Sequence, residues 1–309
     1  MSSQKNNKRK MKSVVTGGAG FIGSHIVDLL LAEGMEVLVI DNLSTGQKKN
    51  VSSGAKLVKA DITNFKEIAP YFRNVDFVFH AAAWPRLQPS FEQPVEHEET
   101  NVIGTINCLL ACRGKKIKKF VYSSSSSVYG NPKELPTSEE APINCLNPYA
   151  LQKYAAEQYC LILGKRYGLP VIALRYSNNY GPRSFNPKNP FNAYSSVIGI
   201  FENQRKEGKP LTITGDGEQK RDFVYVKDVA RANILAAFSK YKGRVYNISF
   251  GKCYSINQVA KMFNAQYKYV PARQEEARVV WLKTDKANEE LRWVPRVGVL
   301  DYVKSLGRS

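Results

Sequence analysis

The sequence has little of what holds a metal ion or a disulfide framework. It contains five cysteines and three histidines in 309 residues. The cysteines are odd in number and form no Cys-x-x-Cys pair, so neither a disulfide framework nor a zinc site is predicted. His25, His80 and His97 are scattered and complete no plausible ligand set. We therefore expect no metal.

Long apolar runs are also missing. No stretch approaches the roughly 20 apolar residues that a membrane-spanning helix requires. Residues 1–11 are rich in lysine, asparagine and serine and lack the apolar segment of a signal peptide. We therefore expect a cytoplasmic protein with no membrane as partner. A chain with 43% hydrophobic and 23% charged residues indicates one large domain or two closely packed lobes.

Acidic residues are scarce: 27 Asp and Glu stand against 45 Lys and Arg, and the formal net charge is +18. The first twelve residues hold no acid and carry Lys5, Lys8, Arg9, Lys10 and Lys12. We expect residues 1–11 to form a basic, disordered tail. Three explanations of this tail stay open: an arm for nucleic acid, a product of start-site choice at Met11, or an aid to solubility.

Nearly continuous apolar runs alternate with helical periodicity through the first half of the chain. The expected strands are residues 13–16, 37–40, 56–60, 77–81, 120–123 and 171–175. The expected helices include residues 20–33, 64–72 and 95–113. Strands that are apolar on both faces and alternate with helices are typical of a parallel sheet covered by helices. We predict an α/β fold with a doubly wound parallel sheet of the Rossmann type.

The alternation degrades beyond Arg175. Residues 177–190 are crowded with Asn, Pro and Gly, and a compact enzyme usually keeps such a loop for a site. A strand and a helix return at 224–240, followed by a strand at 245–249. The expected division is a nucleotide-binding domain of residues 12–175 and 224–249, and a smaller discontinuous α+β lobe of residues 176–223 and 250–309 on the carboxyl edge of the sheet.

A glycine-rich turn, Gly17 to Gly23, follows the first expected strand and opens the first expected helix. Its spacing lets backbone amides and a helix N-terminus meet a pyrophosphate. Asp41 ends the second strand, where a carboxylate can accept hydrogen bonds from an adenosine ribose. Because it would repel a 2′-phosphate, the pattern favours NAD over NADP. Asp61, after the third strand, can reach the adenine or instead cap the next helix.

The stretch Tyr149-Ala-Leu-Gln-Lys153 lies in a helix expected to start near Asn147 and Pro148. Positions i and i+4 share one helix face, so the Lys153 ammonium can lie near the Tyr149 phenol. A second Tyr-x-x-x-Lys, Tyr129 to Lys133, contains Gly and Pro and cannot be helical. Parallel sheets bind ligands beyond the carboxyl ends of their strands, which places residues 81–83 and the serine run 123–127 beside the cofactor.

In combination, the glycine turn, the serine run and the Tyr149/Lys153 pair resemble the extended short-chain dehydrogenase/reductase family. Residues 100–105, 175–183 and 215–223 resemble the same family, and the resemblance covers residues 11–309. The chain looks most like its UDP-hexose 4-epimerases, of the UDP-glucose/UDP-galactose and UDP-N-acetylglucosamine type. The resemblance implies NAD as cofactor, a UDP-sugar as substrate, and a homodimer formed through the helix at 95–113 and the helix bearing Tyr149.

The resemblance also implies roles for individual residues. Tyr149 takes the sugar O4 proton, directly or through Ser125, while hydride passes from C4 to NAD; the 4-keto sugar then turns over and takes hydride back on its other face. The implied catalytic residues are Ser125, Tyr149 and Lys153. The implied cofactor-binding residues are Gly17, Gly20, Phe21, Ile22, Gly23, Asp41, Asn42, Asp61, Ile62, Ala81, Ala82, Ala83, Asn101, Ser123, Tyr149, Lys153 and Tyr176. The implied substrate-binding residues are Ser125, Tyr149, Asn178, Arg221, Arg273 and Val280.

Departures from the family pattern narrow the expected reaction. Residues 124–129 lack the acidic residue that sugar-nucleotide dehydratases and UDP-glucuronate decarboxylases carry here, which disfavours elimination and decarboxylation. Val280 aligns with a position where a Tyr restricts some epimerases to non-acetylated sugars, so we expect UDP-GlcNAc and UDP-GalNAc to be accepted too. Trp84 and Arg86 either reshape the nicotinamide end of the site or, for Trp84, serve packing.

Two other functions stay open. One is another NAD-dependent enzyme of nucleotide sugars, such as a net oxidoreductase, which would accumulate NADH with its product. The other is a non-catalytic protein that senses NAD or binds nucleic acid, as the charge suggests. The intact Ser125, Tyr149 and Lys153 argue against the second. Because the basic residues lack interleaved aromatics in the sequence, nucleic acid is an unexpected partner.

Overall fold

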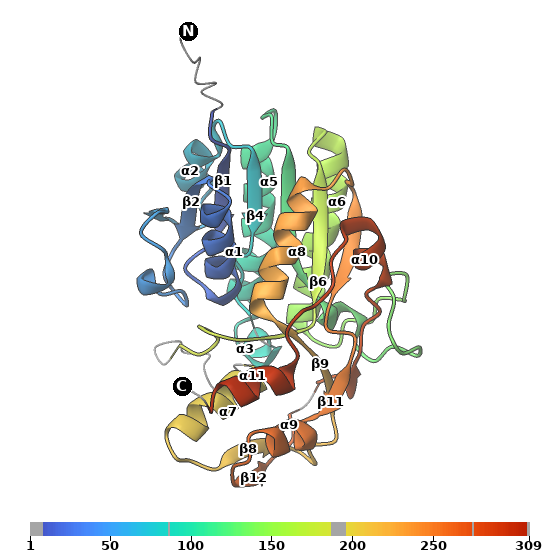
Figure 1. The fold of residues 1–309 in the computed structure, drawn as a ribbon. Helices are drawn as coiled ribbons and strands as arrows, with labels where there is room; N and C mark the ends of the chain where they lie inside the picture. The colour runs from blue at the N-terminus through green and yellow to red at the C-terminus, as the bar shows by residue number, and fades with distance from the viewer. Residues whose placement is uncertain (1–8, 86, 187–195, 274, 308–309) are drawn as a thin grey trace.

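Seven parallel strands form the large sheet of the computed structural model, which describes residues 9–85, 87–186, 196–273 and 275–307 (Figure 1). Their order across the sheet is β10-β6-β5-β4-β1-β2-β3. They are β1 (Lys12–Thr16), β2 (Glu36–Asp41), β3 (Lys56–Lys59), β4 (Phe77–His80), β5 (Lys119–Ser125), β6 (Val171–Tyr176) and β10 (Arg244–Ile248). Successive side chains of a strand point to opposite faces, so Val14 and Val15 belong to different cores.

Helices cover both faces of this sheet. On one face are α1 (Phe21–Ala32), α8 (Val226–Phe238) and α10 (Asp285–Leu291); on the other are α2 (Phe65–Ile68), α5 (Gly104–Cys112) and α6 (Pro148–Tyr167). Ile26 and Val229 pack with Val15 in the first core, while Leu109 and Ala156 pack with Val14 in the second. The prediction of a doubly wound parallel sheet is confirmed.

The helix α6 begins and ends where its sequence dictates. Asn147 caps it, because its side-chain oxygen accepts a hydrogen bond from the backbone N–H of Ala150 at 2.9 Å. Pro148 occupies the first helical position, where its missing N–H costs nothing. At the other end, Gly168 adopts φ +66°, the left-handed conformation that terminates many helices. The predicted start of this helix is therefore confirmed.

Two predicted helices are subdivided in the structure. Instead of one helix over 95–113, the chain forms α4 (Pro94–Glu98), a π-helical segment η3 (Glu99–Ile103) and α5. Instead of one helix over 64–72, it forms α2 and the 3-10 helix η2 (Ala69–Phe72), with Pro70 among the first residues of η2. Shorter segments are η1 (Lys48–Asn50), α3 (Leu87–Glu92) and η4 (Ser126–Tyr129).

A smaller lobe lies beyond the carboxyl ends of the large sheet (Figure 1). Its strands are β7 (Asn178–Tyr180), β8 (Leu211–Thr214), β9 (Lys220–Tyr225), β11 (Cys253–Ser255), β12 (Tyr267–Val270) and β13 (Val279–Val280); its helices are α7 (Val197–Lys206), α9 (Ile256–Met262) and α11 (Val299–Ser305). Phe201, Ile213, Phe223 and Phe263 are buried in its own core. The lobe is thus α+β and built from discontinuous segments.

The strand expected at residue 224 differs from the prediction. It is β9, which starts at Lys220 and pairs with β7, β11 and β13 in the small lobe, whereas the helix α8 that follows packs on the large sheet. The predicted segment 224–249 is therefore divided at Tyr225: β9 ends there in the small lobe, and α8 and β10 belong to the large sheet. Within the described ranges, none of the helices is long and apolar enough to cross a membrane.

Candidate active site

A cavity of about 420 Å³ lies between the carboxyl edge of the large sheet and the small lobe. We call the wall contributed by the large sheet and its loops the sheet half. It includes Gly17, Asp41, Ala81, Ser123 and Tyr149. Its lobe half includes Asn178, Arg221, Arg273 and Val280. Open α/β sheets bind ligands at this edge, so the cavity stands where a site is expected.

The glycine turn approaches neighbouring backbone too closely for any side chain. Gly17 has φ +71°, and a Cβ there would lie 2.5 Å from the Ala82 nitrogen. A Cβ on Gly23 would lie 2.2 Å from the Gly17 oxygen. Both positions therefore need glycine, because the first requires a left-handed backbone and both leave no room. This packing brings the N-terminus of α1 to the cavity wall, where Gly20, Phe21, Ile22 and Gly23 line it.

The N-terminus of α1 suits an anionic ligand. Gly20 is its N-cap and offers no side chain to its first backbone N–H groups. Such N–H groups and the helix dipole attract phosphate. Asp41 lies next to the turn and is 8% exposed; its carboxylate accepts hydrogen bonds from the backbone N–H groups of Ala19, at 2.9 Å, and Leu43, at 2.8 Å. Burial raises the pKa of this carboxyl, against the opposing effect of those hydrogen bonds. The residues present therefore fit a dinucleotide.

Asp61 does not line the cavity, although its hydrogen-bond partner Asn42 and its chain neighbour Ile62 do. The Asp61 carboxylate accepts hydrogen bonds from the Asn42 side chain, at 2.7 Å, and from the Thr63 N–H and hydroxyl, each at 2.8 Å. It does not cap α2 either, because Asn64 is the N-cap residue. In this structure Asp61 holds the Asn42 side chain, which itself lines the cavity.

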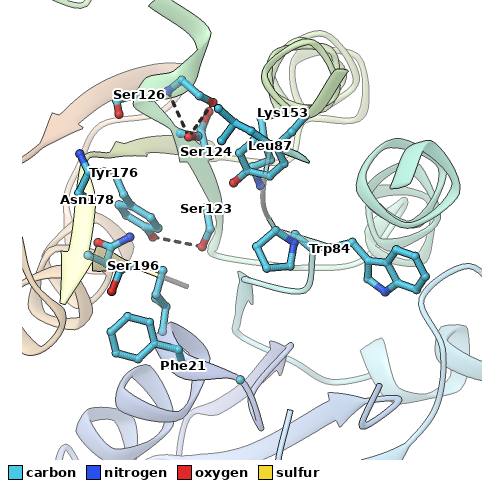
Figure 2. Close-up of a pocket in the computed structure, with 18 of the residues that line it drawn as sticks. Phe21, Trp84, Leu87, Ser123, Ser124, Ser126, Lys153, Tyr176, Asn178 and Ser196 are labelled. Atoms are coloured by element: carbon cyan, nitrogen blue, oxygen red, sulfur yellow. Dashed lines mark hydrogen bonds between the residues drawn. The ribbon is translucent and has the colours of Figure 1, made fainter. Parts of the chain in front are cut away.

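Asn101 is also outside the cavity lining. It is 1% exposed and sits in the π-helical segment η3. Its side chain accepts a hydrogen bond from the Trp84 N–H at 2.8 Å and donates to the Trp84 carbonyl at 3.1 Å. Asn101 thus fixes the loop after β4. The Trp84 ring points away from Ser123 and Tyr176 (Figure 2). It packs edge-on against the His97 ring, with 5.2 Å between the ring centres, which favours a packing role. Arg86 lies outside the described residues.

The acid/base pair lies at the start of α6. Ser90 accepts a hydrogen bond from the Tyr149 backbone N–H at 3.0 Å, and one turn later Lys153 is 4% exposed. The Lys153 ammonium lies 4.5 Å from the centre of the Tyr122 ring, close enough for a cation–π interaction. Burial lowers the pKa of Lys153 to about 8. Tyr149, Lys153 and Ser125 all line the cavity, so the structure brings the three predicted catalytic residues together.

The serine run turns from β5 into η4 at the cavity wall. Ser125 caps η4, and its hydroxyl oxygen accepts hydrogen bonds from the Ser127 N–H at 3.2 Å and the Ser127 hydroxyl at 2.9 Å. Its own hydroxyl proton can therefore be donated elsewhere. Ser123 lies 3.1 Å from the Tyr176 hydroxyl, as Figure 2 shows. Ala81, Ala82 and Ala83 complete this part of the wall.

A buried ion pair behind the serine run was not found from the sequence. Glu157 on α6 is fully buried, and its carboxylate accepts hydrogen bonds from Arg175, at 2.6 and 3.0 Å, and from the Ser124 hydroxyl, at 2.7 Å. Arg175 also donates to the Tyr129 hydroxyl at 2.8 Å, which donates to Asn247. This network ties β5, β6, α6 and β10 together directly behind the site. No local sequence signal links Glu157 to Arg175.

Two arginines and one glutamate dominate the lobe half. Glu276 lies 3.2 Å from Arg221 and 3.5 Å from Arg273. Val280 pairs with Arg221 across β13 and β9, and Asn178 donates a side-chain hydrogen bond to the Asp222 carbonyl at 3.2 Å. All four predicted substrate-binding residues of this half line the cavity. Arg183 is instead paired with Asp28 at 2.8 Å and lies outside its lining.

The NAD dependent epimerase/dehydratase family matches residues 13–249. The chain belongs to this family. NAD is therefore its cofactor, as the glycine turn and Asp41 predict. Within the part of the chain that the structure describes, no group of three or more His, Cys, Asp or Glu side chains could hold a metal.

Proteins similar to this member of the family match it over nearly their whole length. A relative from Methanocaldococcus jannaschii is 41% identical over 300 residues, which cover 94% of this chain and 95% of the relative. The UDP-glucose 4-epimerase of Thermotoga maritima superposes with TM-score 0.91 and 35% identity, covering 96% of this chain and 99% of its own. The UDP-N-acetylglucosamine 4-epimerase of Methanobrevibacter ruminantium gives 0.88 and 33%, covering 97% and 100%. The predicted family and Rossmann fold are confirmed.

Proposed function

We propose that this protein is an NAD-dependent UDP-hexose 4-epimerase, which interconverts UDP-glucose with UDP-galactose and UDP-GlcNAc with UDP-GalNAc through a transient 4-keto sugar. One observation carries the proposal: Lys153, Tyr149 and Ser125 line a single cavity between a dinucleotide turn and two arginines. Similar proteins from T. maritima and M. ruminantium are named as epimerases of these two sugar classes.

The sheet half holds the cofactor. When bound, NAD supplies a hydride acceptor and donor that is regenerated in each cycle. The amides of α1 hold its pyrophosphate, Asp41 accepts hydrogen bonds from the adenosine ribose, and Lys153 holds the nicotinamide ribose. Asp61 and Asn101 act indirectly: Asp61 holds Asn42, and Asn101 holds the loop at Trp84.

Tyr149 moves the proton of sugar O4. Lowering a phenol pKa from about 10 to about 7 requires roughly 4 kcal/mol, at about 1.36 kcal/mol for each pKa unit. An exposed lysine would supply only about 0–1 kcal/mol. Lys153 is buried beside the Tyr122 ring, so its field is screened far less by water. Tyr149 accepts the proton directly or through Ser125 and returns it when the turned keto sugar is reduced.

The lobe half binds the UDP-sugar. Arg221 and Arg273 pair with the diphosphate, for which charge-assisted hydrogen bonds from guanidinium groups are well suited. Asn178 contacts the same diphosphate. The small Val280 side chain leaves room for a 2-acetamido group, so both sugar pairs enter. We assign NAD binding to residues 12–175 with 226–249, and sugar binding to residues 176–225 and 250–309 except α10, which packs on the large sheet.

The remaining assignments concern assembly and location. Leu151 and Ile162 on α6 are 58% and 62% exposed, and Ile103 beside α5 is 45% exposed. These apolar side chains support a homodimer formed through α5 and α6. We place the enzyme in the cytoplasm, where its nucleotide substrates dissolve.

One assay separates this function from its alternatives. Purified protein is incubated with each of the four UDP-sugars, and the products are resolved while absorbance of NADH is followed. Each sugar should yield its 4-epimer with no accumulation of NADH. A net oxidoreductase would instead accumulate NADH in proportion to product. A non-catalytic NAD-binding protein would leave all four sugars unchanged.

A further inference from the structure

The amino edge of the large sheet, opposite the active site, is strongly basic. In Figure 1 it is the end at which the N-terminus enters β1, away from the small lobe. We call the following exposed side chains there the basic edge: Arg9, Lys10, Arg73, Arg113, Lys116, Lys118, Lys165, Arg166, Lys240, Lys242 and Arg244. None of them takes part in the proposed reaction, so this part of the +18 charge needs a separate explanation.

The strand order brings these residues together from distant parts of the chain. Arg244 is the first residue of β10, and the others lie in the segments that precede β10, β6, β5, β4 and β1. These five strands are consecutive neighbours in the sheet. Neighbouring strands are about 4.8 Å apart, so the basic edge extends over roughly 19 Å. The sequence alone shows only separate small clusters.

Acidic side chains do little to neutralise this edge. Asp76 lies within it but is buried, and it is paired with both Arg9, at 2.8 Å, and Lys118, at 3.2 Å. Further acids stand at its two ends, among them the exposed Glu33 between α1 and β2. Glu36 at the start of β2 pairs with Lys12, and Glu290 beyond β10 lies 3.8 Å from Arg244. The basic edge is therefore a band with acidic borders rather than a continuous basic surface.

Helix dipoles explain only part of the band. The C-termini of α5, α6 and α8 point to this edge, and basic residues at a helix C-terminus are favourable. Each dipole amounts to about half a negative charge, so three helices offset about 1.5 charges. The basic edge carries several times that amount. Most of its charge is thus left for a partner.

Aromatic rings lie among the basic side chains in the folded protein. The Arg113 guanidinium is 5.8 Å from the Tyr167 ring centre, and the Lys240 ammonium is 5.5 Å from that of Tyr241. Lys119, buried beneath them, donates hydrogen bonds to the carbonyls of Ser239 and Tyr241 and so holds the loop that carries Lys240 and Lys242. The fold therefore supplies the mixture of aromatic and basic groups that the sequence pattern lacked.

We propose that the basic edge is a docking surface for the phosphate backbone of duplex nucleic acid, without sequence preference. A duplex carries one negative charge per about 1.7 Å of axis with both strands counted, so roughly 19 Å of it holds about 11 charges, and the band can neutralise those on the side that faces it. The acidic side chains at both ends of the band would repel an extended anionic membrane, whereas a duplex is a narrow rod that can lie along the band between them. A membrane would also require several apolar anchors. The described segments that carry the basic edge expose two large apolar side chains close to its basic residues, Phe238 before Lys240 and Ile162 one turn before Lys165.

The test measures binding of the full-length protein to a labelled duplex RNA and a labelled duplex DNA at several salt concentrations. The edge variant carries Arg113→Gln, Lys116→Gln, Lys165→Gln and Arg166→Gln. The control variant removes the same charge from exposed lysines elsewhere: Lys133→Gln, Lys252→Gln, Lys261→Gln and Lys268→Gln. Wild type and control should bind with a strong salt dependence. The edge variant should bind at least about tenfold more weakly, and its salt slope should fall by about 3.6, at about 0.9 for each phosphate that is no longer neutralised.

Three outcomes would overturn the proposal. Equal reductions of affinity in the edge and control variants would show an effect of net charge alone. Binding that disappears in a chain lacking residues 1–8, which keeps Arg9 and Lys10 of the basic edge, would assign it to the terminal tail. Vesicles of phosphatidylglycerol that displace the duplex at equal anionic charge would make a lipid surface the partner. Epimerase activity, which should be unchanged in the edge variant, tests the proposed function separately.

Discussion

The two halves of the cavity are built on different principles. In the sheet half, buried polar groups are paired with protein partners before any ligand arrives: Asp41 with backbone N–H groups, and Glu157 with both Ser124 and Arg175. In the lobe half, Arg221 and Arg273 share one partly exposed glutamate, Glu276. A rigid half suits a cofactor that stays bound through every cycle. A half whose cations can exchange one carboxylate for a diphosphate suits a substrate that enters and leaves.

The largest effect should come from removing the hydroxyl group of Tyr149. Tyr149→Phe should lower kcat about a thousandfold, because positioned acid/base groups contribute roughly 10²–10⁴ in rate. Bound NAD should remain, since most of its assigned partners, among them the glycine turn and Asp41, lie elsewhere in the sheet half. Tyr159→Phe, on the exposed side of the same helix, is the matched control and should keep the wild-type rate. A Tyr149→Phe enzyme with near-normal turnover would remove Tyr149 from the mechanism.

The ion pair behind the sheet half should matter for stability. Arg175→Met leaves the Glu157 carboxylate buried without its guanidinium, which should reduce the free energy of unfolding by about 3–5 kcal/mol. The control is Arg183→Met, whose pair with Asp28 is about one-third exposed and should contribute about 0–1 kcal/mol. Thermal or urea unfolding measures both. Equal, small reductions would mean that the network does not stabilise this half.

A substitution in the lobe half should weaken binding of the substrate and leave binding of the cofactor unchanged. Arg221→Ala should weaken UDP-sugar binding roughly 10- to 100-fold, because hydrogen bonds to charged groups contribute about 1.5–3 kcal/mol. NAD content should not change. Arg278→Ala, which removes an exposed partner of Asp216, should leave both unchanged. Calorimetric titration with UDP and measurement of bound NAD check the two halves independently. A parallel loss of NAD would show that the halves are not separable.

The pH profile should report on Lys153. Its pKa is lowered to about 8 by burial, so the ammonium that stabilises the Tyr149 phenolate loses its proton as the pH rises through about 8. In the enzyme, kcat should therefore decline above that pH by several-fold. Lys153→Met should be slower throughout and should lack this decline. A wild-type rate that is flat up to pH 10 would contradict the assigned role.

A further prediction concerns the choice of sugar. Val280→Tyr fills the space opposite Arg221 in the lobe half and should reduce turnover of UDP-GlcNAc about tenfold or more relative to UDP-glucose, because overpacking a site is costly. Val279→Tyr, one residue earlier on β13, serves as the control. Turnover ratios for the two sugars are compared in each variant. An unchanged ratio in Val280→Tyr would place the determinant elsewhere.

The same contrast explains what could be predicted from the sequence. The strands of the large sheet, the glycine turn and the start of α6 depend on contiguous residues, so periodicity and capping indicate them. The hydrogen bonds of Asp61 with Asn42 and of Asn101 with Trp84 could not be predicted, because they join separate segments of the chain. The Glu157–Arg175 pair and the basic edge both depend on strand order. No local pattern encodes that order.

The most direct test of the central claim is an equilibration experiment with the four UDP-sugars. UDP-glucose and UDP-galactose, incubated separately with the enzyme, should converge on one common ratio with no net NADH, and UDP-GlcNAc and UDP-GalNAc should do the same. Convergence from both sides of each pair would establish reversible 4-epimerisation in this cavity. Stoichiometric NADH, or sugars that stay unchanged while Tyr149, Lys153 and bound NAD are intact, would contradict it.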